Sequence, residues 1–169
     1  VTGGYIFKKD KDSTGDLNFS TSGGGGFGGQ ALKLHEPKPN SMRRTSFGTT
    51  TGWPGPMYTS SASNQMSYLV SYLNRMESSM YPANWLSLTG TNHYSHYLDV
   101  DSFVDLHWIV EFTKLIDGYR LSSFFTKPRD GKVEAGPIWD WNLSYGKANY
   151  LHGGTTNGWY WGERGCPRR

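Results

Sequence analysis

The sequence predicts an α+β fold, in which strands and helices occupy separate stretches of the chain. Short strand-like runs occur within residues 1–39, interrupted by a run of glycines. Two helical patterns follow within residues 63–117. Beyond residue 117 the pattern returns to strand-like runs joined by a turn. Helices do not alternate with strands, and no repeat of about 20 to 50 residues is present, so an alternating α/β fold is not expected.

The composition excludes several classes of protein. The 169 residues include 22 glycines and 8 prolines, too many for a coiled coil, and the aromatic content of 15% is too high for a disordered tail. A net charge of +3 gives no reason to expect nucleic acid as a partner. No apolar stretch approaches the roughly 18 residues of a transmembrane helix. The single cysteine, Cys166, excludes an internal disulfide and a cysteine-rich zinc site.

Three short strands are expected in the first forty residues. Residues 5–7 form an apolar run, residues 17–19 form a short partner for it, and residues 31–35 alternate with two leucines on one face. The glycine run at 23–29 contains a GxGxxG match, but serines and threonines directly precede it and a strand, not a helix, follows it. We therefore interpret this run as a hairpin tip. Residues 40–62 are rich in Ser, Thr, Gly and Pro and predict an irregular loop.

An amphipathic helix is expected to begin at Ser63 or Asn64, because either residue is a suitable N-cap, and to end before Pro82. Its apolar residues recur at the i, i+3, i+4, i+7 spacing of one helix face: Met66, Leu69, Val70, Leu73, Met76 and Met80. This stripe predicts a helix that packs one side against a core.

A second helix is expected to begin after Asp99 or Asp101, with either residue as the cap, and to run to about Ile116. Apolar residues wrap most of its circumference, which predicts a position in the centre of the domain. His107 lies within this helix and is interpreted as a hydrogen-bonded core residue.

A β-hairpin is expected from residues 122–127 and 132–135, because an Asp-Gly pair separates the two strand-like runs. The second strand is expected to end at the Gly-Pro pair that follows it, and residues 138–142 come directly afterwards.

Two carboxylates stand out as candidate functional groups. Asp117 lies at the C-terminal end of the expected second helix, where the helix dipole disfavours negative charge. Asp140 lies between Trp139 and Trp141, where an ionised group needs a cation, a basic partner or several hydrogen-bond donors. Buried structural pairing is the alternative for each carboxylate separately. Because one hairpin joins the two positions, both could point into one cleft.

Two acidic groups in one cleft allow two kinds of chemistry. Paired carboxylates catalyse glycoside hydrolysis. Alternatively, one carboxylate orients a hydroxyl nucleophile while the other binds Mg²⁺ on the transferring phosphates. Asp117 and Ser122 are five residues apart, which is the spacing between the Asp and the metal-binding Asn of a protein-kinase catalytic loop. Asp140 then occupies the place of the metal-binding Asp that follows that loop.

Other polar residues have simpler explanations. His93 and His96 are three residues apart, but their segment reads as a loop and no third metal ligand is evident. The acidic residues at the start of the second helix are explained by capping and by the helix dipole.

Four segments of the chain resemble the CotH kinase family, the spore coat protein H-like atypical protein kinases. They are GGYIFKK at 3–9, YLDVDSFVD at 97–105, KLIDGYRLS at 114–122 and GPIWDWNLSYG at 136–146, the last being the most specific. The resemblance extends from residue 1 to about residue 161.

The resemblance implies a diverged protein-kinase-like fold that transfers the γ-phosphoryl group of ATP to Ser or Thr hydroxyls of a protein substrate. By resemblance, Asp117 is the catalytic residue that orients the substrate hydroxyl, and Asp140 is a Mg²⁺ ligand. Asn142 is a second metal ligand, in place of the second Asp of the family's Asp-aromatic-Asp pattern. Ser122 and Trp139 are expected at the cofactor, with Ser122 where a kinase offers Asn and Trp139 walling the site.

The resemblance also implies that residues 1–169 are a single partial domain. The chain begins at Val1 without an initiator methionine, and in the family the phosphate-covering loop and the nucleotide-binding lysine lie upstream. We therefore expect the full-length parent to be active and this piece alone to be inactive. The expected divisions are strands and a glycine loop (1–39), a loop (40–62), a helical part (63–117), the hairpin and catalytic and metal loops (118–162), and a tail (163–169). Family resemblance further implies a bacterial protein at the cell surface or outside the cell.

The alternative is a secreted, non-catalytic binding or structural module. Four aromatic residues near the C-terminus fall in a glycine-rich stretch and could stack on sugar rings or on a protein surface: Tyr150, Trp159, Tyr160 and Trp161. A glycosidase that uses the two carboxylates is a third reading.

Overall fold

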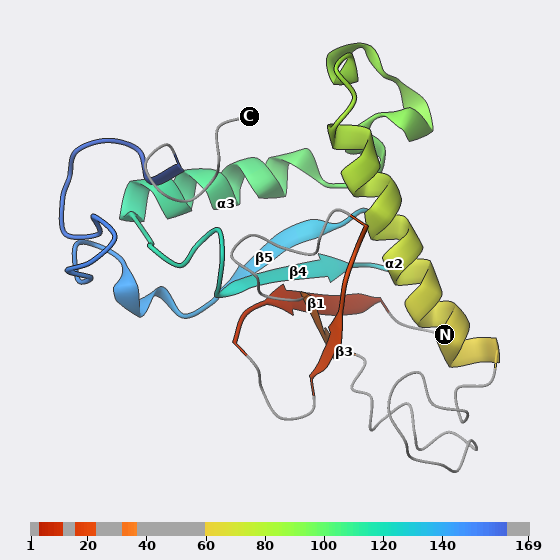
Figure 1. The fold of residues 1–169 in the computed structure, drawn as a ribbon, viewed down its shortest axis with the longest axis horizontal. Helices are drawn as coiled ribbons and strands as arrows, with labels where there is room; N and C mark the ends of the chain where they lie inside the picture. The colour runs from red at the N-terminus through yellow and green to blue at the C-terminus, as the bar shows by residue number, and fades with distance from the viewer. Residues whose placement is uncertain (1–3, 12–15, 23–31, 37–59, 162–169) are drawn as a thin grey trace.

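A computed structural model describes residues 4–11, 16–22, 32–36 and 60–161, which form one five-stranded antiparallel sheet and two long helices (Figure 1). The strand order is β2-β3-β1-β4-β5. The strands are β1 (Tyr5–Lys9), β2 (Leu17–Phe19), β3 (Leu32–Glu36), β4 (Ser123–Lys127) and β5 (Glu134–Ile138). The predicted α+β class is confirmed. The glycine run at 23–29, residues 40–59 of the predicted loop, and Cys166 lie outside the described residues.

The first strand occupies the centre of the sheet. β1 pairs with β3 on one side and with β4 on the other, and Phe7 lies opposite both Leu34 and Phe125. The predicted pairing of residues 17–19 with 5–7 is wrong, because β2 pairs with β3 instead. β1 therefore joins the N-terminal strands to the C-terminal hairpin.

The predicted hairpin is confirmed, since β4 and β5 pair antiparallel. β5 continues through Pro137 to Ile138, although the Gly-Pro pair was expected to end it. An edge strand has an unpaired side, so the missing proline N–H costs it no ladder hydrogen bond there. The strand thus reaches directly to Trp139.

Helix α2 (Ser60–Met80) begins earlier than the stripe of apolar residues predicted. Ser63 and Asn64 lie inside the helix, so the prediction that one of them is the N-cap is wrong, and so is the assignment of residues 60–62 to a loop. The apolar stripe begins only at Met66, and its members from Met66 to Met76 pack in or against the core, whereas the helix itself starts six residues before Met66. Its C-terminal end, two residues before Pro82, is as predicted.

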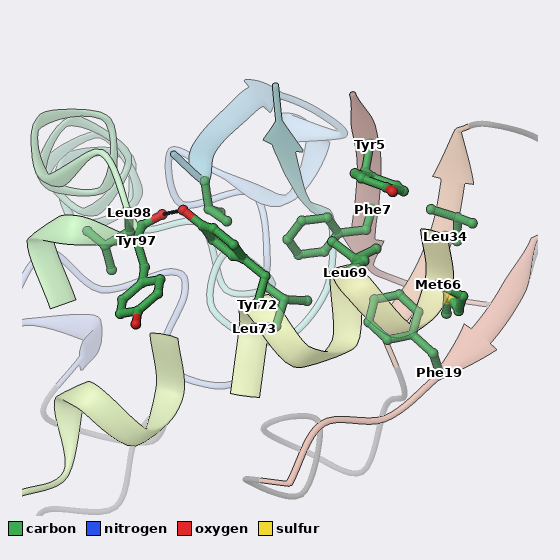
Figure 2. Packing of buried hydrophobic residues seen from close by; sticks show 11 residues of the cluster. Tyr5, Phe7, Phe19, Leu34, Met66, Leu69, Tyr72, Leu73, Tyr97 and Leu98 are labelled. Carbon is green, nitrogen blue, oxygen red and sulfur yellow. Dashed lines mark hydrogen bonds between the residues drawn. The ribbon is translucent and has the colours of Figure 1, made fainter. Parts of the chain in front are cut away.

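The main core lies between the sheet and α2 (Figure 2). Leu34 and Leu69 are fully buried in it, and Phe7 stacks on Phe125 with ring centroids 5.3 Å apart. Phe103 of the second long helix, α3 (Val100–Thr113), stacks on the same Phe125 ring at 5.9 Å. Both helices therefore pack on the sheet face that carries Phe7. The buried members of the cluster are Tyr5, Phe7, Phe19, Leu34, Met66, Leu69, Tyr72, Leu73, Tyr97, Leu98 and Val133.

Helix α3 begins as predicted, with Asp99 as its N-cap, because the Asp99 carboxylate accepts the Ser102 N–H at 2.9 Å. Its expected central position is wrong. Val104, Trp108 and Phe112 form an i, i+4, i+8 stripe whose exposed fractions are 45%, 56% and 83%. The helix lies along one side of the sheet, so that only part of its circumference meets the core (Figure 1).

Helix α3 ends at Thr113, earlier than the predicted Ile116. Lys114 takes a left-handed conformation, with φ 48° and ψ 51°, and its N–H bonds to carbonyls of the last helical turn. Residues 114–122 are therefore a turn that connects α3 to β4, and Asp117 belongs to this turn.

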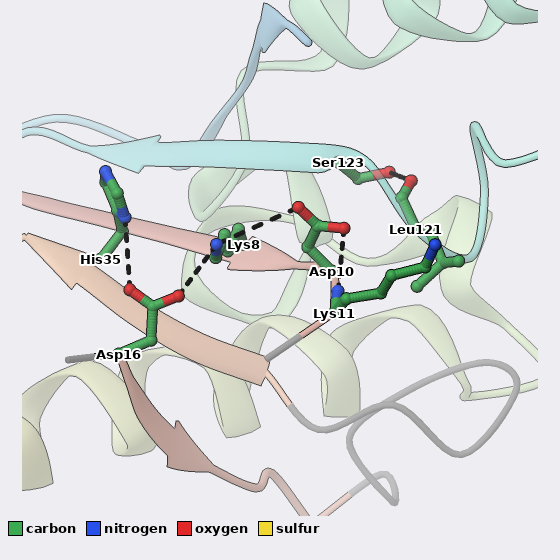
Figure 3. A network of polar contacts seen from close by, with 7 residues as sticks. All are labelled: Lys8, Asp10, Lys11, Asp16, His35, Leu121 and Ser123. Atoms are coloured by element: carbon green, nitrogen blue, oxygen red, sulfur yellow. Dashed lines mark hydrogen bonds and ion pairs between the residues drawn. The ribbon is translucent and has the colours of Figure 1, made fainter. Parts of the chain in front are cut away.

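The opposite face of the sheet carries a network of charged side chains (Figure 3). The Lys8 ammonium lies 2.8 Å from the Asp16 carboxylate and 4.0 Å from Asp10, and His35 Nδ1 lies 3.4 Å from Asp16. The Lys8 and Asp16 side chains are only 5% and 2% exposed. Lys8 also lies over the ring of Phe124, at 5.6 Å from its centroid. The ion pairs thus cover the face of the sheet that the helices leave open.

Candidate functional site

Asp117 lies four residues beyond the end of α3, in the turn that leads to β4. The expected unfavourable interaction of Asp117 with the helix dipole is wrong, because the helix has already ended at Thr113. Its carbonyl accepts the N–H groups of Arg120 and Leu121 at 2.9 and 2.7 Å. Its carboxylate Oδ1 accepts a bond from the Arg120 guanidinium at 3.1 Å. Asp117 is therefore held in place by its own turn.

The ion pair of Asp117 and Arg120 is partly exposed, with side-chain exposures of 13% and 38%. Asp117 Oδ2 accepts no hydrogen bond from the described part of the chain. Arg120 Nε is buried and has no acceptor among the described residues. Within the described residues, this ion pair therefore leaves one carboxylate oxygen and one guanidinium N–H without a partner.

Close packing fixes this turn. A Cβ at Gly118 would lie 2.7 Å from both methyl carbons of Val110, so only glycine fits directly after Asp117. The Ser123 hydroxyl donates to the carbonyls of Gly118 and Leu121 at 3.0 and 2.9 Å (Figure 3 draws the second of these). Ser122 has a φ of 51° and is 5% exposed. The turn is therefore a rigid support for the Asp117 carboxylate.

Asp140 and Asn142 lie where β5 ends and a short 3₁₀ turn, η6 (Trp141–Leu143), begins. Asp140 has a left-handed backbone, with φ 56° and ψ 56°, and its side chain makes no capping hydrogen bond. Both side chains are exposed. The expected enclosure of the Asp140 carboxylate between two indoles is wrong, because the side chain is exposed; the exposed carboxylate has room for a cation but does not require one.

The two indoles beside Asp140 contact different elements. Trp139 packs on Phe124 with ring centroids 5.7 Å apart and is 55% exposed. Trp141 donates its indole N–H to the Thr113 hydroxyl at 3.0 Å. The left-handed residue between them turns the chain, so that the carboxylate is left in solvent.

The structure brings the Asp140 segment to the C-terminal end of α3. Besides the Trp141 bond, the Tyr145 N–H donates to the Thr113 carbonyl at 2.8 Å, and Figure 1 shows the chain after β5 beside that helix end. Thr113 is four residues before Asp117. Neither Asp117 nor Asp140 lines any of five cavities found among the described residues. The two segments are thus neighbours at one helix end, without a shared pocket in this structure.

The donor set at Asp140 suits only one mode of metal binding. Among the described residues no group of three His, Cys, Asp or Glu side chains is placed to hold a metal ion. Asp140 and Asn142 offer one carboxylate and one amide oxygen. Mg²⁺ keeps several waters and is commonly held by one or two carboxylates together with substrate phosphates. These residues fit a Mg²⁺ ion that arrives with a polyphosphate and do not fit one held by the protein alone.

Glu111 is a buried residue of this region that the sequence did not single out. Its carboxylate accepts the N–H groups of Tyr160 and Trp161 at 2.8 and 2.9 Å, and the Tyr119 hydroxyl at 2.7 Å. The same Tyr119 hydroxyl lies 2.7 Å from His107 Nδ1, so the hydrogen bond expected of His107 is confirmed, but its side chain is only half-buried and does not belong to the core. The sequence did contain one signal for this role, because Glu111 is a single acidic residue within an apolar helical run.

Glu111 ties the C-terminal segment to the turn that carries Asp117. Tyr160 is 2% exposed, and its hydroxyl donates to the carbonyl of Ile116, the residue before Asp117. The proposed aromatic platform is therefore wrong for Tyr160, which belongs to the core. Trp159 is exposed, but it meets Trp108 edge-on at 5.8 Å and does not extend a flat stacking surface.

Together, the structure defines an α+β domain with two acidic segments gathered at one end of a helix. The model of the CotH kinase protein family matches residues 16–166, and the chain belongs to this family. No curated protein and no solved structure matches the chain. Membership supports a kinase-like function, and Asp117, Ser122, Asp140 and Asn142 all lie within the matched range.

Within the described residues, neither long helix combines the length and the apolar character that crossing a bilayer requires.

Proposed function

We propose that this chain carries the catalytic turn and the metal-binding segment of an atypical protein kinase, which transfers the γ-phosphoryl group of ATP to Ser or Thr hydroxyls. The observation that carries the proposal is the family match across residues 16–166, which includes both acidic segments. The exposed Asp140 carboxylate beside Asn142 and the fixed Asp117 turn support it.

Asp117 is the residue that would orient the substrate hydroxyl and accept its proton. Arg120 holds Oδ1 at 3.1 Å, and Oδ2 has no partner in the described part of the chain, so one oxygen is available to a hydroxyl group. The tight packing at Gly118 keeps the carboxylate in one position, as an orienting group requires.

Asp140 and Asn142 would hold Mg²⁺ jointly with the ATP phosphates. The ion, when bound, neutralises the charge that develops on the transferring phosphoryl group. Trp139, which rests on Phe124 and is half exposed, would form a wall beside that group. Ser122 would lie at the cofactor, where a kinase offers its metal-binding Asn; it is 5% exposed, so the nucleotide would approach it from the turn.

The wider setting follows from the same resemblance. The nucleotide-binding lysine and the phosphate-covering loop would come from a part of the parent protein outside residues 1–169, so this piece alone should not phosphorylate itself or a substrate. A protein with Ser or Thr hydroxyls is the substrate, and the surface of a bacterial cell or the extracellular space is the location.

The test compares two aspartate variants of the full-length parent. Asp140→Ala should lower transfer of labelled phosphate from ATP–Mg²⁺ to a Ser-containing protein or peptide by at least about 100-fold, because it removes the carboxylate proposed to hold the metal. Asp130→Ala, at the exposed tip of the hairpin, is the matched control and should retain full activity. Full activity of Asp140→Ala would remove this residue from the mechanism.

A binding experiment separates the kinase from the alternative of a carbohydrate-binding module. Calorimetry of the full-length parent should detect binding of ATP only when Mg²⁺ is present and should detect no binding to a panel of polysaccharides. Binding to a polysaccharide without binding to ATP–Mg²⁺ would favour the non-catalytic module.

A further inference from the structure

A large open cleft lies between α2 and the chain that follows it. Its volume is about 780 Å³, within the roughly 300–1,000 Å³ of ligand pockets. One wall is a stripe along α2, and the other comes from residues 88–97, which include two short 3₁₀ turns. Neither Asp117 nor Asp140 lines it. The cleft is therefore separate from the proposed site of phosphoryl transfer.

One hydrogen bond between the two walls and one within the second wall fix the shape of the cleft. The Tyr72 hydroxyl of α2 donates to the Tyr97 carbonyl at 2.8 Å, as Figure 2 shows. The Tyr97 hydroxyl in turn donates to the Thr91 carbonyl at 2.7 Å. The Tyr72 and Tyr97 rings meet edge-on at 5.3 Å. These contacts hold the two walls at a set separation, so the cleft exists before any ligand binds.

The charge of the lining favours an anion. Arg75 and His96 line the cleft, whereas no Asp or Glu of the described chain does. Arg75 makes no hydrogen bond or ion pair with any described residue. Its neighbour on the helix, Glu77, accepts the Thr21 hydroxyl at 2.7 Å and does not line the cleft. An exposed guanidinium without a carboxylate partner is suited to bind a carboxylate or a phosphate group.

The length of the cleft favours an extended ligand. Its α2 wall includes Tyr68, Tyr72, Arg75 and Ser79, which follow an i, i+4, i+7, i+11 stripe. At about 1.5 Å per residue, this stripe is about 16 Å long. An extended peptide covers that length with about five residues, at about 3.3 Å each. A single small anion would fill only the part around Arg75.

We propose that this cleft binds an extended peptide segment that places one negatively charged side chain, glutamate or phosphoserine, against Arg75. The polar groups along the walls, such as the Asn92 amide, are available to the peptide backbone. This inference goes beyond phosphoryl transfer and does not depend on it.

The test uses four fluorescein-labelled heptapeptides in an alanine-glycine background, which differ only at the central residue: Glu, phosphoserine, Ser or Lys. Fluorescence anisotropy with the 169-residue chain at low salt should show at least fivefold tighter binding of the Glu or the phosphoserine peptide than of the Ser and Lys peptides. Higher salt should weaken that binding. Which of the two anionic peptides binds more tightly identifies the source of the charge.

Variants of two arginines provide the decisive comparison. Arg75→Ala should abolish the preference for the anionic peptide, while circular dichroism stays unchanged because alanine is a good helix former. Arg129→Ala, at the exposed tip of the hairpin, should leave the affinity within twofold. Equal affinity for all four peptides, or an unchanged preference in Arg75→Ala, would overturn the proposal. Binding of inorganic phosphate as tight as that of the peptides would overturn the extended-peptide ligand. None of these outcomes bears on phosphoryl transfer.

Discussion

Replacing Glu111 by glutamine changes the charge at the point where α3 holds the C-terminal segment. The Glu111 carboxylate is buried and accepts three bonds, from the Tyr160 and Trp161 N–H groups and from the Tyr119 hydroxyl. Oε1 accepts two of these bonds and Oε2 accepts the third, from the buried Tyr160 N–H. An amide keeps one oxygen, so at least one N–H must face the new NH₂ group.

The expected magnitude follows from these contacts. Glu111→Gln loses one charge-assisted bond to a buried N–H and weakens two others, which should lower the free energy of unfolding by about 2 kcal/mol. Glu111→Ala removes all three acceptors and should cost about 4 kcal/mol. For a chain of this length, 2 kcal/mol corresponds to a fall in Tm of about 4–8 °C.

Urea unfolding, followed by tryptophan fluorescence and by circular dichroism, measures this effect. The backbone N–H of Trp161 donates a hydrogen bond to the Glu111 carboxylate, so the fluorescence of Trp161 reports on the affected region. Glu134→Gln is the matched control, because Glu134 is exposed and bonds only to Thr126 among the described residues; it should change stability by less than about 0.5 kcal/mol. A change in Glu111→Gln as small as in this control would refute the idea that the carboxylate holds the C-terminal segment.

Three further predictions concern local structure and pH. Asp99→Ala removes the cap on the Ser102 N–H and should cost about 1 kcal/mol in urea unfolding; no loss would mean that the cap is dispensable. Gly118→Ala places a Cβ 2.7 Å from the Val110 methyl carbons and should cost about 1–3 kcal/mol, whereas a neutral effect would show that the turn can relax. Burial raises the pKa of Tyr72 to about 12, so the folded chain keeps this proton while the unfolded chain loses it near pH 10, and stability should fall between about pH 10 and 12. Tyr72→Phe has no phenol to ionise, so between about pH 10 and 12 its free energy of unfolding should decline by roughly 2 kcal/mol less than that of the unsubstituted chain. Equal declines in the two proteins would contradict the burial of the phenol.

Features that depend on neighbouring residues could be predicted from the sequence. The Asp-Gly turn, the alternation in the strands and the Asp99 cap each involve residues a few positions apart. The start of α2 could not be predicted in this way, because no apolar stripe marks the turn that begins at Ser60. The packing of α3 was misjudged since an apolar residue indicates a preference for burial and not the presence of a partner to cover it.

In the candidate site, too, the sequence indicated the residues but not their surroundings. The sequence indicated Asp117 and Asp140 by residue type and position, but it assigned both to the wrong surroundings. Asp117 lies beyond the helix instead of at its end, and Asp140 is solvated instead of buried between indoles. The surroundings depend on where Trp139 and Trp141 pack, and their partners lie 15 and 28 residues away along the chain.

The sequence by itself determined the α+β class, most of the strands and helices, and the family, because these are recorded in local patterns and in short motifs. Only the tertiary structure decided that β1 lies at the centre of the sheet, that Glu111 binds the backbone of residues 49 and 50 positions away, and that Arg75 faces a cleft in which no described Asp or Glu meets it. The physical reason is that hydrogen bonds, burial and ion pairing depend on distance in space, and the chain sets these distances only when β1 and β4, more than a hundred residues apart, pair in one sheet.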